Sequence, residues 1–206
     1  MNQRVLILDY GMGNIFSVQK KIKSLGITPI ISSSREEILN ADKIILPGVG
    51  HFSKAMENLK KLNVIDVLNE KILEKKTPVL GICLGMQLMA LSSEEGKTNG
   101  FGWFDAEVKK FNIQDKLNFK VPQMGWNTIS INKKSDLMKN ISDQSEFYFI
   151  HSFYLKCNNE EDVLNKTVYE NEFVSAIEKD NIFGVQYHPE KSHEIGEKMF
   201  KNFIQI

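Results

Sequence analysis

The sequence lacks the features that mark a secreted or membrane-bound protein. It holds only two cysteines, which excludes the disulfide framework of a secreted domain and indicates a reducing compartment, the cytoplasm. No apolar run approaches the roughly 18 residues needed to cross a bilayer, and the apolar segment after Arg4 is too short for a signal peptide. The 26 basic and 26 acidic side chains cancel, so no positive field attracts nucleic acid or an anionic membrane. We therefore expect a small molecule and another protein as partners.

The first half of the sequence alternates short apolar runs with amphipathic stretches. Expected strands are residues 5–8, 28–31, 43–46 and 78–82, with helices ending near 25, starting at 35, within 52–75 and starting at 84. This alternation is typical of βαβ units, which build a parallel sheet covered on both faces. The pattern predicts a doubly wound α/β fold. No linker or repeat divides the 206 residues, so we expect one domain over residues 1–206.

The second half changes to strand after strand. Expected strands are residues 107–111, 127–131, 147–157, 174–179 and 182–187, followed by a final helix over 194–204. Strands that follow one another without intervening helices favour antiparallel pairing. We therefore expect antiparallel strands that extend the parallel sheet or lie beside it.

Cys83 lies at a predicted strand-to-helix junction, between Gly81 and Gly85. This G-x-C-x-G pattern is the thiol counterpart of the G-x-S-x-G nucleophile elbow, in which small flanking residues permit a sharp turn. The unpaired amides at a helix N-terminus favour thiolate over thiol, and the amide of Leu84 can donate to an oxyanion. The alternative is a small buried hydrophobe, which is our interpretation of Cys157.

His188 and Glu190 stand on either side of Pro189. Proline fixes its own φ and disfavours a helical conformation in the residue before it. In an extended segment both side chains face one side, with Cα atoms about 7 Å apart. Glu190 can then orient one imidazole nitrogen while the other faces a thiol, so Cys83, His188 and Glu190 form a candidate catalytic triad. A solvated or core histidine is the alternative.

Six segments carry a family resemblance. They are D-Y-G-M-G-N at 9–14, L-P-G-V-G-H-F at 46–52, G-I-C-L-G-M-Q at 81–87, P-Q-M-G-W-N at 122–127, Y-F-I-H-S-F-Y at 148–154 and G-V-Q-Y-H-P-E-K-S at 184–192. In this order they resemble the class I (triad) glutamine amidotransferases and, within them, the glutaminase subunits of imidazole glycerol phosphate synthases. The resemblance implies a flavodoxin-like, mostly parallel sheet with added antiparallel strands, L-glutamine as substrate, and no cofactor or metal. It also implies a heterodimer with a separate synthase or cyclase subunit, shaped as a (β/α)8 barrel.

The turn at 47–50 is expected to complete the oxyanion hole. Its glycines permit backbone amides to face a ligand, so Val49 or Gly50 can supply the second donor beside Leu84. An ordinary strand-to-helix turn is the alternative. The resemblance further implies four substrate-binding residues, which are Gly50, Gln87, His151 and Ser152. Gln87 lies one helical turn after Cys83, although it could equally be solvated, and a satisfied core histidine remains the preferred interpretation of His151.

Two glycine-rich turns bear apolar groups of the kind enriched at protein interfaces. The resemblance makes these turns and one lysine candidates for the surface that seals against the partner and passes ammonia on unprotonated. The expected interface residues are Tyr10, Met12, Asn14, Met124, Trp126, Asn127 and Lys191. Alternatively, the two turns merely cap the sheet.

The sequence also leaves three alternative functions to consider. The segment at 93–106 is closer to paralogous glutaminase subunits that feed ammonia to a sugar amidotransferase in surface-glycan synthesis. A free-standing γ-glutamyl hydrolase would have no need of the P-Q-M-G-W-N surface. An inactive scaffold subunit would have no need of an intact Cys83, His188 and Glu190.

Overall fold

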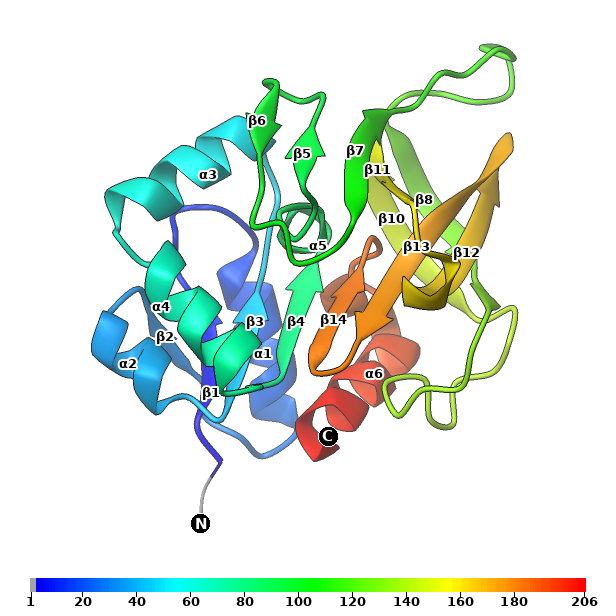
Figure 1. The fold of residues 1–206 in the computed structure, drawn as a ribbon. Coiled ribbons are helices and arrows are strands. Elements are labelled where there is room, and N and C mark those ends of the chain that lie inside the picture. Colours follow the sequence, from blue (N-terminus) through cyan, green and yellow to red (C-terminus); the bar gives the residue numbers. More distant parts are fainter. Residues whose placement is uncertain (1–2) are drawn as a thin grey trace.

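The computed structural model describes residues 3–206, and its centre is a parallel sheet (Figure 1). Five strands lie in the order β2-β1-β3-β4-β14, and each pairs in parallel with its neighbours. Their bounds are Ile30–Ser32 (β2), Val5–Leu8 (β1), Lys43–Leu46 (β3), Val79–Ile82 (β4) and Ile182–Val185 (β14). Every residue of β1, β3, β4 and β14 is buried. The order reverses between β1 and β3, and such sheets bind ligands beyond the carboxyl ends of their strands.

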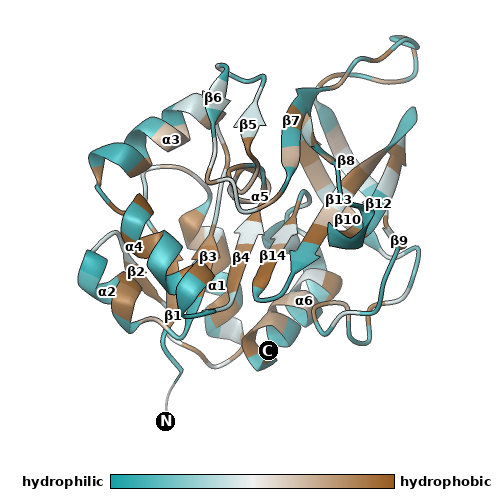
Figure 2. Cartoon of the chain, viewed as in Figure 1, coloured by the Kyte–Doolittle hydropathy of each residue, from teal (hydrophilic) through white to brown (hydrophobic). Residues whose placement is uncertain are grey.

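Helices cover both faces of this sheet. Helices α1 (Ile15–Ser24) and α6 (His193–Gln205) contribute buried side chains to one core cluster. Helices α2 (Arg35–Asn40), α3 (Phe52–Lys61) and α4 (Ile65–Asn69), with the π-helical turn Glu70–Glu74, contribute to the other. Hydrophobic residues gather on the central strands and on the inner sides of the helices (Figure 2).

Antiparallel strands extend the sheet beyond β14. The continuation is β13 (Asn171–Lys179), β11 (Phe153–Cys157), β7 (Ala106–Lys110), β5 (Ser92–Ser93) and β6 (Thr98–Asn99), while β12 (Val163–Tyr169) pairs with β13 and with β9 (Ser130–Ile131). Strands β8 (Gln123–Thr128) and β10 (Glu146–His151) form a separate two-stranded sheet. A 3-10 turn, Glu160–Asp162, precedes β12.

The expected flavodoxin-like doubly wound α/β fold with added antiparallel strands is confirmed. Two local expectations are wrong. The expected strand over 147–157 is two strands that join different sheets, because the chain turns at Ser152. The segment 124–127, expected as a turn, lies within β8. The helix expected to start at 84 is confirmed as α5 (Leu84–Gln87), which is one turn long. Strand β12 was not expected. No helix within residues 3–206 combines the length and apolarity needed to cross a membrane.

Candidate active site

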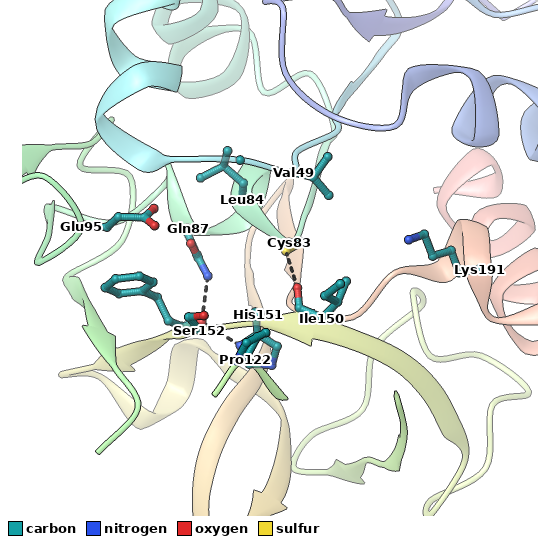
Figure 3. A pocket seen from close by; sticks show the side chains of 12 residues that line it. Val49, Cys83, Leu84, Gln87, Glu95, Pro122, Ile150, His151, Ser152 and Lys191 are labelled. Carbon is teal, nitrogen blue, oxygen red and sulfur yellow. Dashed lines mark hydrogen bonds between the residues drawn. The ribbon is translucent and has the colours of Figure 1, made fainter. Parts of the chain in front are cut away.

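Four segments that follow parallel strands meet at the carboxyl edge of the sheet. They follow β1, β3, β4 and β14, and they begin at Asp9, Pro47, Cys83 and Gln186 respectively. A pocket of about 310 Å³ opens beside them, and Cys83 lies in its wall (Figure 3). The β10–β11 turn forms the opposite wall with Ile150, His151 and Ser152. The pocket thus lies between the parallel half of the molecule and the small sheet.

Cys83 adopts a backbone conformation that L-residues rarely accept, with φ of +53° and ψ of −107°. A β-carbon added to Gly81 would lie 2.6 Å from the amide nitrogen of Met86, and one added to Gly85 would collide with the carbonyl oxygen of Leu46. The close approach expected from the G-x-C-x-G pattern is therefore confirmed. Strain of this kind concentrates at reactive sites, where the surrounding packing maintains it.

His188 and Glu190 form a buried hydrogen-bonded pair. The ring Nδ1 lies 2.8 Å from Glu190 Oε1, and both side chains are almost fully enclosed. The expected extended conformation holds for His188, but Glu190 lies in the 3-10 turn Pro189–Lys191. That turn still brings the carboxylate back to the ring. Among the described residues, His188 Nε2 has no hydrogen-bond partner, so that nitrogen is available to a proton of the reaction.

The charge of His188 depends on Cys83. Burial lowers the pKa of His188, but the negative charge and hydrogen-bonding capacity of Cys83, followed by those of Glu190, outweigh it and raise the pKa to about 10. With this raised pKa, His188 is an imidazolium at neutral pH, and a positively charged ring favours negative charge on a sulfur that faces it. Helix α5 has only one turn and carries little dipole, so His188 is the stronger source of thiolate stabilisation.

The segment of His188 is fastened to the small sheet. The His188 amide donates to Tyr148 O at 2.8 Å, and the Tyr148 amide donates to Ser192 Oγ at 3.0 Å. Ser192 Oγ in turn donates to His188 O at 2.7 Å. Tyr148 belongs to β10, so the imidazole is held by the sheet that walls the pocket.

The expected oxyanion donors are not aligned together in this conformation. The Leu84 amide donates to Gly48 O at 3.4 Å rather than into the pocket. Val49 and Gly50 do line the pocket, and Gly50, with φ of +130°, packs against Met12. A rotation of the Gly48–Val49 peptide would remove the carbonyl from Leu84 and could turn an amide toward the sulfur.

Comparison with known proteins identifies the family of the chain that forms this pocket. The family model described as "Glutamine amidotransferase class-I" matches residues 6–206. The chain belongs to the class I glutamine amidotransferase family.

Relatives of this amidotransferase span nearly its whole length. "Imidazole glycerol phosphate synthase subunit HisH 2" of Methanococcus maripaludis is 50% identical, with 98% of each chain covered. The protein of the same name from Pseudomonas aeruginosa is 44% identical, with 98% of this chain and 99% of the relative covered. Among solved structures, a chain of PurLQS from Thermotoga maritima superposes with a TM-score of 0.73 at 16% identity, covering 100% of this chain and 99% of that one. That last likeness concerns the fold.

All four expected substrate-binding residues line the amidotransferase pocket. Gln87 uses its amide nitrogen internally, donating to Phe153 O at 2.9 Å and to Gln186 Oε1 at 3.0 Å. Its oxygen therefore remains to accept from a ligand. The interpretation of His151 as a satisfied core histidine is only half right. Nδ1 lies 2.7 Å from Phe153 O, whereas Nε2 has no partner among the described residues. Burial lowers the pKa of His151 to about 3, so the ring is neutral.

Two residues in the site were missed from the sequence. Glu95 places its carboxylate in the pocket wall and accepts the Phe52 amide at 2.7 Å. It belongs to the segment at 93–106, for which the sequence predicted no residue of the site. Gln186 is fully buried and donates to Cys83 Sγ at 3.5 Å. Its position two residues before His188 is a signal that could have found it, because alternate residues of an extended chain face the same side.

The expected partner surface is only partly exposed. Met124 and Trp126 are 62% and 45% exposed, although they lie on strand β8 rather than on a turn. Tyr10 is a correction, because its side chain is buried and its hydroxyl donates to Pro47 O. Lys191 is exposed at the pocket rim, with its ammonium over the Tyr148 ring. Met12, Asn14 and Asn127 are half-buried, and Asn127 donates to Val168 O.

Proposed function

We propose that this chain is the glutaminase subunit of an imidazole glycerol phosphate synthase, acting as one domain over residues 1–206. It hydrolyses L-glutamine to glutamate and delivers the ammonia to a cyclase subunit on a separate chain, in histidine biosynthesis. The names of the full-length relatives support the pathway. The single observation that carries the chemistry is the buried His188–Glu190 pair, whose imidazole interacts with a strained Cys83 in the pocket wall.

Two acceptors at one end of the pocket fit the ammonium group of free glutamine. The Glu95 carboxylate and the Gln87 side-chain oxygen can both accept hydrogen bonds there, and neither can donate. The glutamine side chain then extends toward Cys83 Sγ. An amino acid bound by its α-ammonium is distinguished from a glutaminyl residue within a peptide, whose nitrogen is uncharged.

The reaction requires two proton transfers and one thioester. Cys83 thiolate attacks the amide carbon of the glutamine side chain, and imidazolium His188 gives its proton to the departing nitrogen, which leaves as ammonia. Neutral His188 then removes a proton from water, whose oxygen attacks the thioester and releases glutamate and the thiolate. Glu190 holds the ring tautomer throughout. The oxyanion of each tetrahedral intermediate is held by the Leu84 amide and that of Val49 or Gly50.

The cyclase subunit is expected to be a (β/α)8 barrel that forms a heterodimer with this chain. Met124, Trp126 and Lys191 supply its contact surface beside the pocket, with Met12, Asn14 and Asn127 at its edge. Docking there shields ammonia from water, which would protonate it. Met12 packs against Gly50. A partner that contacts Met12 would therefore favour the rotation of the Gly48–Val49 peptide that frees the Leu84 amide. A reactive thiol of this kind suits the reducing cytoplasm.

Glutamine turnover with and without the cyclase subunit tests this function. We expect the cyclase to raise the turnover number at least about tenfold, since the Leu84 amide is otherwise occupied. Cys83→Ala in the complex should abolish glutamine-dependent synthesis and leave ammonia-dependent synthesis intact. Full glutaminase activity in Cys83→Ala would refute the assignment of the nucleophile.

The same assay separates the alternative functions. Stimulation by a sugar amidotransferase and not by the cyclase would assign the chain to surface-glycan synthesis. High turnover with no partner would indicate a free-standing γ-glutamyl hydrolase. Failure of a glutamine-analogue electrophile to label Cys83 in the assembled complex would indicate a scaffold.

A further inference from the structure

Gln186 contacts the reacting sulfur, yet the proposed reaction gives it no part. It is the first residue after β14, its side chain is 0% exposed, and its Nε2 donates to Cys83 Sγ at 3.5 Å. Its backbone is fixed as well, since the Gln186 amide donates to Ser175 O at 2.9 Å. A buried side-chain amide without hydrogen-bond partners destabilises the fold, so buried amides are normally hydrogen-bonded.

The orientation of the Gln186 amide follows from its neighbours. Phe153 O can only accept, so the group of Gln87 that faces it at 2.9 Å is the amide nitrogen. The same nitrogen donates to Gln186 at 3.0 Å, which makes the Gln186 group at that contact the oxygen. The Gln186 nitrogen therefore points at Cys83 Sγ. A backbone carbonyl thus fixes the direction of the whole chain of hydrogen bonds, which runs from Gln87 through Gln186 to the sulfur.

Two neighbours of the sulfur favour opposite protonation states. Ile150 O lies 3.9 Å from Cys83 Sγ and can be bridged only by a thiol proton (Figure 3). The Gln186 N–H needs no proton on sulfur and bonds more strongly to a charged acceptor than to a neutral one. In this buried setting the difference is not screened by water. Gln186 is therefore a fixed donor that favours thiolate from the side of the sulfur reached by β14.

We propose that Gln186 stabilises the Cys83 thiolate and that Gln87 holds it in the donating orientation. This inference rests on the proposed function only in taking Cys83 as the nucleophile. When the thiol proton moves to His188 Nε2, the Ile150 contact is lost and the Gln186 bond strengthens. The imidazolium needed to protonate departing ammonia is thereby maintained. As the thioester forms, the sulfur loses its charge and Gln186 releases it.

The test is the pH dependence of Cys83 alkylation by iodoacetamide in the full chain, with Cys157→Ser as the common background. Gln186→Met keeps the length of the side chain and removes the donor. We expect the alkylation midpoint to rise by about one pH unit or more. Gln186→Glu places a carboxylate there and should raise the midpoint further, since like charges oppose each other.

A matched control separates this role from the cost of altering a buried polar side chain. Asn165 is also 0% exposed, and its amide donates to the Tyr187 hydroxyl and to Met138 Sδ, not to Cys83 Sγ. Asn165→Leu should leave the midpoint unchanged. If Gln186→Met does not fold, Gln87→Met releases the Gln186 amide from its fixed orientation and should raise the midpoint by a smaller amount. An unmoved midpoint in the folded Gln186 or Gln87 variants would overturn the proposal.

The alkylation assay measures the reactivity of Cys83 Sγ in the absence of glutamine and of a partner. If the wild-type chain with its cyclase fails to turn over glutamine while Gln186→Met raises the alkylation midpoint, the proposed function is refuted and the role of Gln186 stands. Normal turnover with no midpoint shift would do the reverse.

Discussion

The two cysteines of this chain lie in the two halves of the fold, and their surroundings differ in charge. Cys83 follows a parallel strand and faces His188, whose pKa is raised by that sulfur. Cys157 ends the antiparallel strand β11, where burial, followed by Asp162, Glu160 and Asp105, raises its pKa to about 12. Neither forms a disulfide, yet only Cys83 has an imidazole as its charged neighbour, whereas the charged neighbours of Cys157 are carboxylates. Sequence position relative to the sheet edge, rather than burial alone, separates a nucleophile from an inert thiol.

The parallel half and the small sheet also differ in how closely neighbouring backbone segments lie around their glycines. In the parallel half, glycines let β3, β4 and α5 touch. The small sheet has room to spare, because a β-carbon added to Gly125 would meet nothing within 4 Å. The parallel half holds Cys83, whereas the β10–β11 turn supplies the opposite wall of the pocket and β8 exposes Met124 and Trp126.

The largest predicted effect is on the free energy of unfolding, when one glycine in each half is replaced by alanine. Gly85→Ala drives a carbon into the Leu46 carbonyl oxygen, and we expect a loss of at least about 4 kcal/mol of unfolding free energy. Gly125→Ala meets only backbone strain, since its φ is +131°, and should cost about 1–3 kcal/mol. Urea unfolding measures both. Equal losses would contradict the difference in packing between the halves.

The second prediction concerns the ionisation of His188. In the wild-type protein the ring should stay protonated up to about pH 10, as its pKa indicates. In Cys83→Ser the leading charge that raises this pKa is removed while burial remains, so the ring should lose its proton at least two pH units lower, by roughly 1.4 kcal/mol per unit. Histidine NMR titration measures it. His151, whose pKa burial lowers to about 3, should stay neutral over the same pH range and serves as the reference ring.

The third prediction tests the exposed face of the small sheet. Trp126→Ala should weaken binding of the cyclase subunit about 30-fold, or ~2 kcal/mol, as expected for a central aromatic contact. Leu39 on α2 has the same 45% exposure as Trp126, and Leu39→Ala should leave the affinity unchanged. Titration calorimetry of the two variants decides. Equal affinities would remove β8 from the interface.

The smallest effect is predicted for the second cysteine. Cys157→Ser should leave the glutaminase turnover number within about twofold of wild type, because the thiol takes no part in the reaction. Its raised pKa should also make Cys157 the slower of the two to alkylate at neutral pH, by roughly 100-fold or more. Mass spectrometry of briefly alkylated protein measures the ratio. Comparable labelling would show that the two environments are alike.

Sequence patterns predicted the parallel half well because its strands are short apolar runs bounded by helices. The elbow at Cys83 was equally visible, since two glycines at fixed spacing have a steric cause. The antiparallel half was predicted less well. Nothing local signals that the chain changes sheets at Ser152, and strand β12 alternates weakly because many of its residues are buried on both faces. Glu95 is recognised as a site residue only through a contact made across the fold, whereas the spacing of Gln186 from His188 was a signal already present in the sequence.

The hydrogen bonds of Ser192 connect the small sheet to the segment that carries His188. Tyr148, which bonds the His188 segment through its backbone, pairs directly with Trp126 on β8. If the proposed partner displaces β8, we therefore expect His188 to move together with the pocket wall, while Cys83 stays with the parallel strands. Proton transfer is steeply sensitive to the separation of its two atoms, so docking on one face can time the chemistry on another without any residue of the partner entering the pocket.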